Sequence, residues 1–265
     1  MRDISDMLEE WPYDPASCVR KIEAADGREV LQVRTPLGIE QYELEGRPDG
    51  LRPYGEESVL DHAEAQVLLH TERAGETEGF VIDDRVAVEL QQEGLLYYYR
   101  YLVCFQIGEY DVVIRDARRN LRMFDLLKLY CTDTEVVNDG EQYRPYVMRM
   151  ASAAEALQAI ANSDSVRAKS VIRKAMRAIS ALPAVPTATF EHERKRSLAI
   201  LGGMLKALPQ SRRPTEEEVL RRELEKAVAQ ENYERAAALR DQLRGLAAPG
   251  GEPAHGPGER YFSSS

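Results

Sequence analysis

The chain has 265 residues, of which 43% are hydrophobic, so it can form a proper core and is not expected to be disordered overall. Its formal net charge is −10, and neither a membrane-length apolar run nor an apolar N-terminal leader is present in the sequence, which predicts a soluble cytoplasmic protein. Cys18, Cys104 and Cys131 stand apart from one another, which argues against a disulfide framework or a structural zinc site and favours inert thiols.

The N-terminal region, residues 1–55, is predicted to form a small antiparallel β-meander. The segments CVRKIEA, EVLQVRT and IEQYELE, within residues 18–45, alternate apolar and polar side chains with period two. Asp26-Gly27 and Pro36-Leu37-Gly38 supply the turns between them. Because three short strands are not stable alone, we expect one sheet face to be covered by Trp11 to Pro15 or by a following helix.

Residues 56–208 are predicted to form a helical body, because apolar residues recur there every three or four positions. The first helix carries an apolar stripe of Val59, Leu60, Ala63, Val67 and Leu68. A second helix, capped by Asp83 or Asp84, is expected to break or bend near Gly94. Two helices are predicted to meet at Gly108-Glu109, and three more to follow: from Pro145 to about Ala161, over VRAKSVIRKAMRAISAL, and over 190–208.

Segment 97–121 is similar to a tetratricopeptide repeat (TPR). Gly108 lies at the turn between helices and Tyr110 two residues later, while Val113, Ala117 and Leu121 take the inward positions. Tyr101 stands where the repeat prefers a small residue, and no second copy follows at 34 residues, although 146–182 is a second possible helix pair. The resemblance implies a TPR-like body of helical hairpins and leaves open whether it binds a peptide.

The sequence contains no recognisable catalytic motif. It has no G-x-x-x-x-G-K-[ST], G-x-G-x-x-G, H-E-x-x-H or G-x-S-x-G pattern, and its histidines lie far from its cysteines. His62 and His70 are expected on a solvated helix face, and Asp111 and Asp116 at the surface. We therefore predict a protein that is not an enzyme and has no catalytic residue, metal or cofactor. The alternative is an enzyme whose active site is assembled from residues scattered along the chain.

The dense aromatic run Tyr97-Tyr98-Tyr99-Arg100-Tyr101 is not expected to form a stacking platform. Consecutive residues of a helix spread over all its faces. Most of the run is therefore predicted to be core, with one tyrosine exposed.

Positive charge is concentrated between residues 167 and 213, where eleven Lys or Arg residues stand against two acidic ones. Such a stretch in an acidic protein is able to meet nucleic acid phosphate, the acidic part of the same chain or an acidic partner. The candidate phosphate contacts are Arg173, Lys174, Arg177, Arg194, Lys195 and Arg196.

After a linker at 209–214, residues 215–246 are predicted to form a coiled-coil-like helical hairpin, followed by a disordered tail at 247–265. Thr215 and Glu218 have capping-box spacing, and Gln230-Glu231-Asn232 makes the turn. The two facing stripes are Leu220, Leu224, Ala227 and Val228, and Tyr233, Ala236, Ala237, Leu243 and Leu246.

This hairpin, with its sequence NYERAAALRDQL, closely resembles the UVR domain, which occurs in two subunits of the bacterial excinuclease, in Clp-type unfoldases and in activators of protein-arginine kinases. The matching positions, which the resemblance makes the candidate partner-binding residues, are Leu220, Leu224, Tyr233, Glu234, Ala236, Ala237, Arg240 and Asp241. The chain as a whole is also similar to bacterial proteins that carry this motif, with an N-terminal WPY and a helical middle.

The resemblance implies docking to a protein partner or to a second copy of the chain. The nuclease, helicase, Walker A and zinc motifs of the larger UVR proteins are absent from the sequence. We therefore predict an interaction adaptor in stress response or repair. The alternative is a nucleic-acid-associated accessory factor of excision repair that uses the 167–213 stretch.

Overall fold

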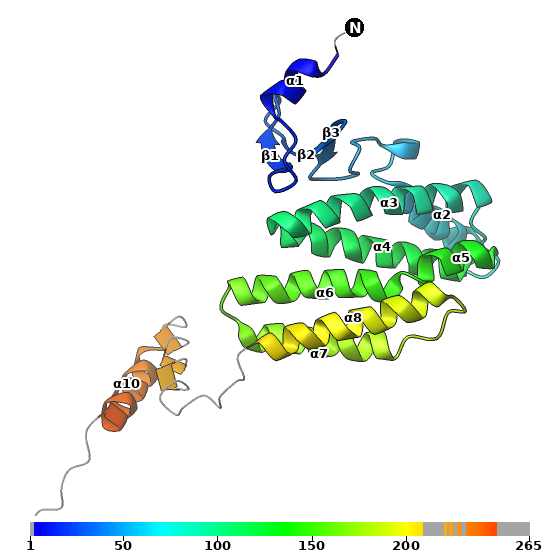
Figure 1. Ribbon diagram of the computed structural model, residues 1–265. Coiled ribbons are helices and arrows are strands. Elements are labelled where there is room, and N and C mark those ends of the chain that lie inside the picture. Colours follow the sequence, from blue (N-terminus) through cyan, green and yellow to red (C-terminus); the bar gives the residue numbers. More distant parts are fainter. Residues whose placement is uncertain (1–2, 209–219, 222, 225–226, 229–231, 248–265) are drawn as a thin grey trace, which may run out of the picture. The chain divides into compact units, whose positions relative to one another are not determined.

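The computed structural model describes residues 3–208, 220–221, 223–224, 227–228 and 232–247, which form two compact units, Met1–Pro209 and Gln210–Ser265. The first unit contains a small antiparallel sheet and a stack of helices, and the second contains the C-terminal hairpin (Figure 1). The mainly helical fold with an N-terminal meander is therefore confirmed. The predicted linker, the tail from residue 248, and Thr215 and Glu218 lie outside the described residues.

The sheet has the order β1-β2-β3, formed by β1 (Val19–Glu23), β2 (Glu29–Thr35) and β3 (Gly38–Glu43). A short helix, α1 (Ser5–Glu10), precedes it and was not predicted. Leu31 on β2 pairs with Tyr42 on β3, and both are buried in the core that the sheet shares with the helices. On the opposite face, the Arg20 guanidinium lies 4.0 Å from the centre of the Trp11 ring. The helices thus cover one face of the sheet, as one of the two predicted alternatives had it, and Trp11 contacts the other face.

The helices of the first unit follow one another with short connections: η1 (Pro53–Gly55), α2 (Val59–Ala74), α3 (Asp84–Ile107), α4 (Tyr110–Tyr130), α5 (Thr134–Glu141), α6 (Arg144–Ala161), α7 (Ser165–Ser180) and α8 (Ala188–Ala207). Side chains of Ser58, Asp83, Asp164 and Thr187 cap α2, α3, α7 and α8. Gly108 ends α3 with a φ of 82°, a left-handed conformation that glycine adopts without strain. The predicted turn between α3 and α4 is therefore confirmed.

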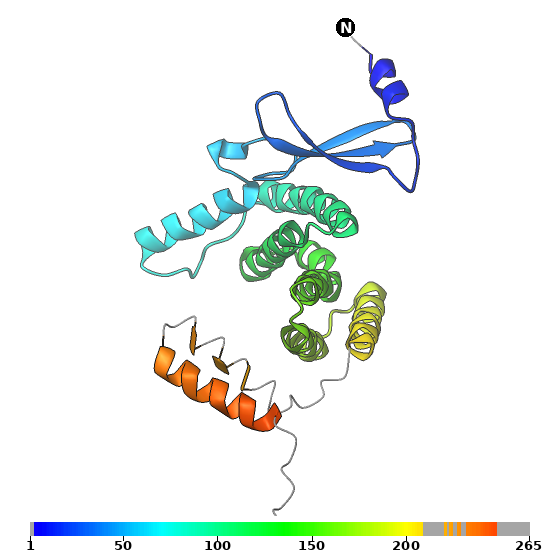
Figure 2. The ribbon, with the colours of Figure 1, turned by 90° about the vertical axis from the view of Figure 1, so that its left-hand side faces the viewer.

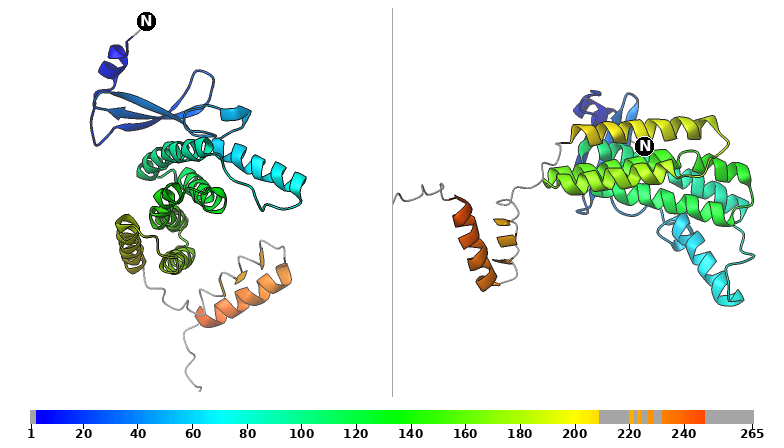
Figure 3. Two further views of the ribbon diagram at one scale, coloured as in Figure 1. Left: turned by 90° about the vertical axis from the view of Figure 1, so that its right-hand side faces the viewer. Right: turned by 90° about the horizontal axis from the view of Figure 1, so that it is seen from below.

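The sheet lies over α3 and α4, with α6 below them and α7 and α8 beyond α6 (Figure 2). Seen from below, α6, α7 and α8 lie side by side (Figure 3). One core joins the sheet to α2, α3, α4 and α6, and a second core lies between α6, α7 and α8. The predicted regions 1–55 and 56–208 therefore share hydrophobic packing within one compact unit. The TPR-like character of the body stays a prediction.

Three expectations for individual residues were wrong. Helix α3 continues through Gly94 without the predicted break, and a Cβ atom there would lie 2.9 Å from Met123 Cε, so this glycine allows close packing on α4. Leu68 is 60% exposed because α2 packs on the core mainly through its first turns. Asp116 is fully buried, because it forms an ion pair with Arg100.

The tyrosine run behaves as predicted. Tyr97 and Tyr101 are buried, Tyr98 is half-buried and Tyr99 is exposed. Among the described residues, no helix is both long enough and apolar enough to cross a membrane.

Candidate partner-binding site

The described part of the C-terminal hairpin consists of helical residues between 220 and 228 and of α10 (Tyr233–Ala247). The Asn232 amide donates to the Ala227 carbonyl (2.8 Å), which closes the turn. The Asn232 side chain accepts from the Arg235 amide (3.1 Å) and so caps α10. The described residues of the first helix and α10 pack on each other, while Gln230 and Glu231 of the predicted turn lie outside the described residues.

The hairpin has a very small hydrophobic cluster of its own. Ala227, Ala236 and Leu239 are buried, and the half-buried Leu220 and Leu224 pack against them. A segment this short with so few buried side chains gains little stability from its own packing, so a partner surface would stabilise it further. Leu220 and Leu224, which were predicted as partner contacts, thus pack on the hairpin itself.

The inward side of α10 differs from the predicted stripe. Leu239 is buried there and was not predicted, whereas Ala237 faces solvent and Tyr233 is 69% exposed. On the first helix, Val228 is 46% exposed. The helical period explains this difference. Leu239 lies three positions after Ala236 and therefore on the same face of α10, whereas Ala237 lies on the neighbouring face. The side chain of Leu246 lies outside the described residues.

The exposed side of α10 carries the polar positions of the motif. Tyr233, Glu234, Ala237, Arg240 and Asp241 are all exposed and occupy adjoining positions of the helix surface. Asp241 pairs with Arg244 at 3.9 Å, whereas no ion pair of Glu234 or Arg240 occurs among the described residues. The structure thus brings together an aromatic ring and unpaired charges on one continuous surface.

The opposite flank of α10 is used within the hairpin. Arg235 Nη2 lies 3.4 Å from Glu223 Oε2 on the first helix. Gln242 is exposed on this same flank, away from Tyr233 and Arg240. The two flanks therefore differ: one supports the hairpin and the other is available for contact.

These features define a small helical hairpin. The family model described as "UVR: UvrB/uvrC motif" matches residues 218–248, so the chain carries a UVR motif in this segment. No curated protein and no solved structure matches the chain.

The predicted phosphate contacts lie on α7 and α8. Arg173, Lys174 and Arg177 on α7 are exposed and form no ion pair within the described part of the chain. On α8, Arg194 lies 2.9 Å from Glu191 and Arg196 lies 3.6 Å from Glu193, whereas Lys195 is exposed. Among the described residues of this stretch, exposed positive charge without an ion pair therefore lies on both helices, at Arg173, Lys174 and Arg177 on α7 and at Lys195 and Lys206 on α8.

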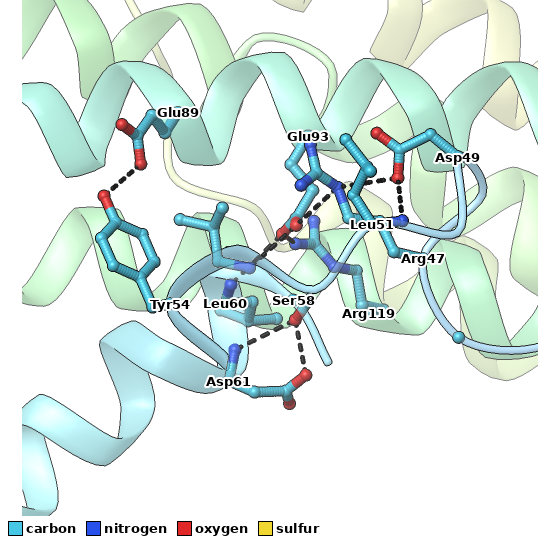
Figure 4. A network of polar contacts seen from close by, with 12 residues as sticks. Arg47, Asp49, Leu51, Tyr54, Ser58, Leu60, Asp61, Glu89, Glu93 and Arg119 are labelled. Atoms are coloured by element: carbon cyan, nitrogen blue, oxygen red, sulfur yellow. Dashed lines mark hydrogen bonds and ion pairs between the residues drawn. The ribbon is translucent and has the colours of Figure 1, made fainter. Parts of the chain in front are cut away.

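A buried ionic network beneath the sheet was missed by the sequence analysis (Figure 4). Glu93 on α3 has no exposed surface and accepts hydrogen bonds from the amides of Val59 (2.8 Å) and Leu60 (3.2 Å), at the start of α2. Its carboxylate also pairs with Arg119 of α4 and, at 3.3 Å, with Arg47. Glu93 therefore joins α2, α3, α4 and the loop after β3.

A second buried pair holds the same loop. Arg100 Nε and Nη2 donate to the two carboxylate oxygens of Asp116 at 2.7 and 2.8 Å. Its Nη1 donates to the carbonyls of Glu43 (2.7 Å) and Gly46 (2.9 Å). The Tyr97 ring lies between the guanidinium groups of Arg100 and Arg119, 5.0 and 4.3 Å from its centre. Both carboxylates are saturated with donors, so this network fixes the loop and offers no free acid or base.

Elsewhere the described residues offer little reactive chemistry. Burial raises the pKa of the Cys104 thiol to about 12, which keeps it protonated and a poor nucleophile near neutral pH. Burial likewise raises the pKa of Tyr97 to about 12. No cluster of three metal-ligating side chains occurs among the residues that the structure describes.

Proposed function

We propose that the protein is a non-enzymatic adaptor that docks onto a protein partner, or onto a second copy of itself, through the exposed side of its UVR hairpin. The carrying observation is the surface formed by Tyr233, Glu234, Ala237, Arg240 and Asp241. It places an exposed tyrosine beside two charges, Glu234 and Arg240, that form no ion pair among the described residues. Exposed tyrosine and arginine are typical of residues that dominate binding energy at interfaces. The UVR match supports the proposal, because the motif is named after two proteins, UvrB and UvrC, that share it.

The small cluster of the hairpin supports the same proposal. With Ala227, Ala236 and Leu239 as its only fully buried apolar residues among those described, the hairpin gains stability when a partner covers it. Its opposite charges, Glu234 and Arg240, would determine which partners are accepted.

The test compares Tyr233→Ala combined with Arg240→Glu against Gln242→Ala, a control on the opposite flank of the same helix. Binding to a captured partner, or self-association by light scattering, is expected to weaken at least ~10-fold in the double variant, since interface aromatic and arginine residues contribute about 2 kcal/mol or more. The control is expected to bind as the unchanged chain does. Equal binding by all three chains would count against the proposal.

A second function, contact with nucleic acid through α7, is favoured by one observation. Arg173, Lys174 and Arg177 are exposed and unpaired within the described residues, so their charge is available to phosphate. The absence of exposed aromatic side chains on α7 favours backbone contact over base recognition.

Replacing Arg173, Lys174 and Arg177 by Glu tests this second function. Fluorescence anisotropy with labelled duplex and single-stranded DNA is expected to show binding at low salt that falls steeply as salt is added and is lost in this variant. A variant with three other exposed arginines, Arg52, Arg73 and Arg85, changed to Glu serves as the charge-matched control. If the unchanged chain binds neither probe at low salt, the nucleic-acid function is ruled out.

A further inference from the structure

Strand β3 forms one edge of the sheet, and part of its backbone points away from the sheet. In an antiparallel pair, the N–H and C=O of successive residues point alternately toward the neighbouring strand and away from it. The Glu43 amide donates to the Pro48 carbonyl (2.9 Å), not to β2, so Glu43 belongs to the outward set. Ile39 and Gln41 lie four and two positions before Glu43, so their backbone groups also point away from β2. Among the described residues, neither forms a backbone hydrogen bond with a group outside the sheet.

An open pocket of about 590 Å³ lies alongside this edge. Its walls are Glu40, Gln41 and Tyr42 of β3, Pro48 and Asp49 of the following loop, and Leu96 and Tyr99 of α3. Tyr99 is 49% exposed, and Leu96 is half-buried. A strand edge with free backbone groups therefore borders a partly apolar groove whose floor is a helix.

The groove is negatively charged. Its lining holds two carboxylates, Glu40 and Asp49, and no lysine or arginine. Asp49 lies 3.3 Å from Arg47, but Glu40 forms no ion pair within the described part of the chain and accepts only the hydroxyl of Tyr42 (2.5 Å). An unpaired carboxylate beside an apolar floor complements a positively charged side chain on the occupant.

The buried network makes the groove rigid. Arg100 and Glu93 fix the loop between Glu43 and Asp49, which forms one wall, against α3 and α4. Because the wall is already fixed, an incoming segment does not bear the entropy cost of ordering it.

We propose that this groove binds an extended, basic peptide segment of a partner protein, which adds to the sheet as a fourth strand beside β3. The segment pairs its backbone with Ile39 and Gln41. Its side chains alternate, so two residues separated by one position face the groove. One is a lysine or arginine that meets Glu40, and the other is an apolar residue that covers Leu96 and Tyr99. This binding surface is separate from the UVR hairpin and does not depend on the function proposed for it.

A random peptide library displayed on phage and selected against the full chain tests this inference. Enriched peptides are expected to share a basic and an apolar residue two positions apart. Their affinity, measured by fluorescence polarisation with synthetic peptides, is expected to fall at least ~10-fold with Glu40→Lys, because the charge pair becomes a repulsion. Glu23→Lys, an exposed acid on the opposite edge strand, is the charge-matched control and is expected to bind normally.

Gln41→Pro tests the backbone contacts separately. Its amide points outward, so proline there removes a donor for the peptide and leaves the bonds between β2 and β3 in place. Thermal unfolding confirms that the variant is folded. If it is not, Glu40→Gln tests the charge contact with a smaller change than Glu40→Lys. A clear loss of binding is expected in the folded variant.

Three results would overturn the proposal. The first is that no peptide is enriched, and the second is that enriched peptides bind Glu40→Lys and Gln41→Pro as tightly as the unchanged chain. The third is that another occupant already covers the groove. If that occupant is the C-terminal segment, peptides would bind a chain ending at residue 247 far more tightly than the full chain. If it is a second copy of the chain, Glu40→Lys would dissociate a dimer detected by light scattering.

Discussion

At Glu93, a carboxylate without exposed surface is held by four donors from three parts of the chain: two amides of α2, Arg119 of α4 and Arg47. Such a group is costly to bury, and its arginine partners compensate for that cost only while all are present. Removing the carboxylate charge would leave Arg119, itself buried, without its counterion. The network is therefore sensitive to single substitutions.

Glu93→Gln is predicted to lower the free energy of unfolding by ~3–5 kcal/mol, as expected when one member of a buried ion pair is removed. The measurement is urea denaturation followed by circular dichroism. The control is Glu89→Gln, one turn earlier on α3, where the side chain accepts a hydrogen bond from Tyr54 at a solvent-exposed site. The control variant is expected to lower the free energy of unfolding by no more than ~1 kcal/mol. Similar losses for both variants would contradict the role given to Glu93.

The contacts and burial of individual residues were the hardest features to predict from the sequence. Glu93 and Arg119 are 26 positions apart, and Arg100 and Glu43 are 57 apart, so no local pattern indicates that they meet. In the hairpin, the choice between Ala237 and Leu239 as the buried residue depends on how α10 is rotated against the first helix. The run AAAL fits more than one rotation.

At the level of elements, caps and turns were predictable because their signals are local. Asp83 and Gly108 begin and end α3 where the sequence indicated. Helix α5 was missed, since its eight residues include Gly140 and only two apolar residues, Val136 and Val137, which are too few to show a helical repeat. The structure explains this glycine: a Cβ atom there would lie 2.9 Å from Phe124 Cδ1. Gly140 has a low intrinsic helix propensity, but close packing against Phe124 requires a glycine at this position.

Gly140→Ala is predicted to destabilise the protein by ~1–3 kcal/mol, because the added methyl group meets a buried aromatic ring that cannot move aside easily. Gly203→Ala on α8 is the matched control, since no atom lies within 4 Å of its Cβ position. This second change is expected to stabilise the protein by up to ~1 kcal/mol through helix propensity. Melting temperatures provide the comparison, and shifts of the same sign would contradict the packing role of Gly140.

For the whole molecule, the division into Met1–Pro209 and Gln210–Ser265 separates the sheet and the helical stack from the UVR segment. The first unit contains the cores shared by the sheet and the helices, whereas the described residues of the second unit form one small cluster around Leu239. The UVR segment was predictable because its residue types recur in a recognised pattern. The edge groove was not, because it is formed by β3, the 48–49 loop and α3 together.

The most direct test of the adaptor proposal compares the full chain with a chain that lacks residues 215–246. Both are used for affinity capture, and their masses are measured by light scattering. We predict that the full chain captures a partner or forms a dimer, and that the deletion abolishes this while the thermal unfolding of the first unit is unchanged. An unchanged capture profile together with an unchanged oligomeric state would contradict the account.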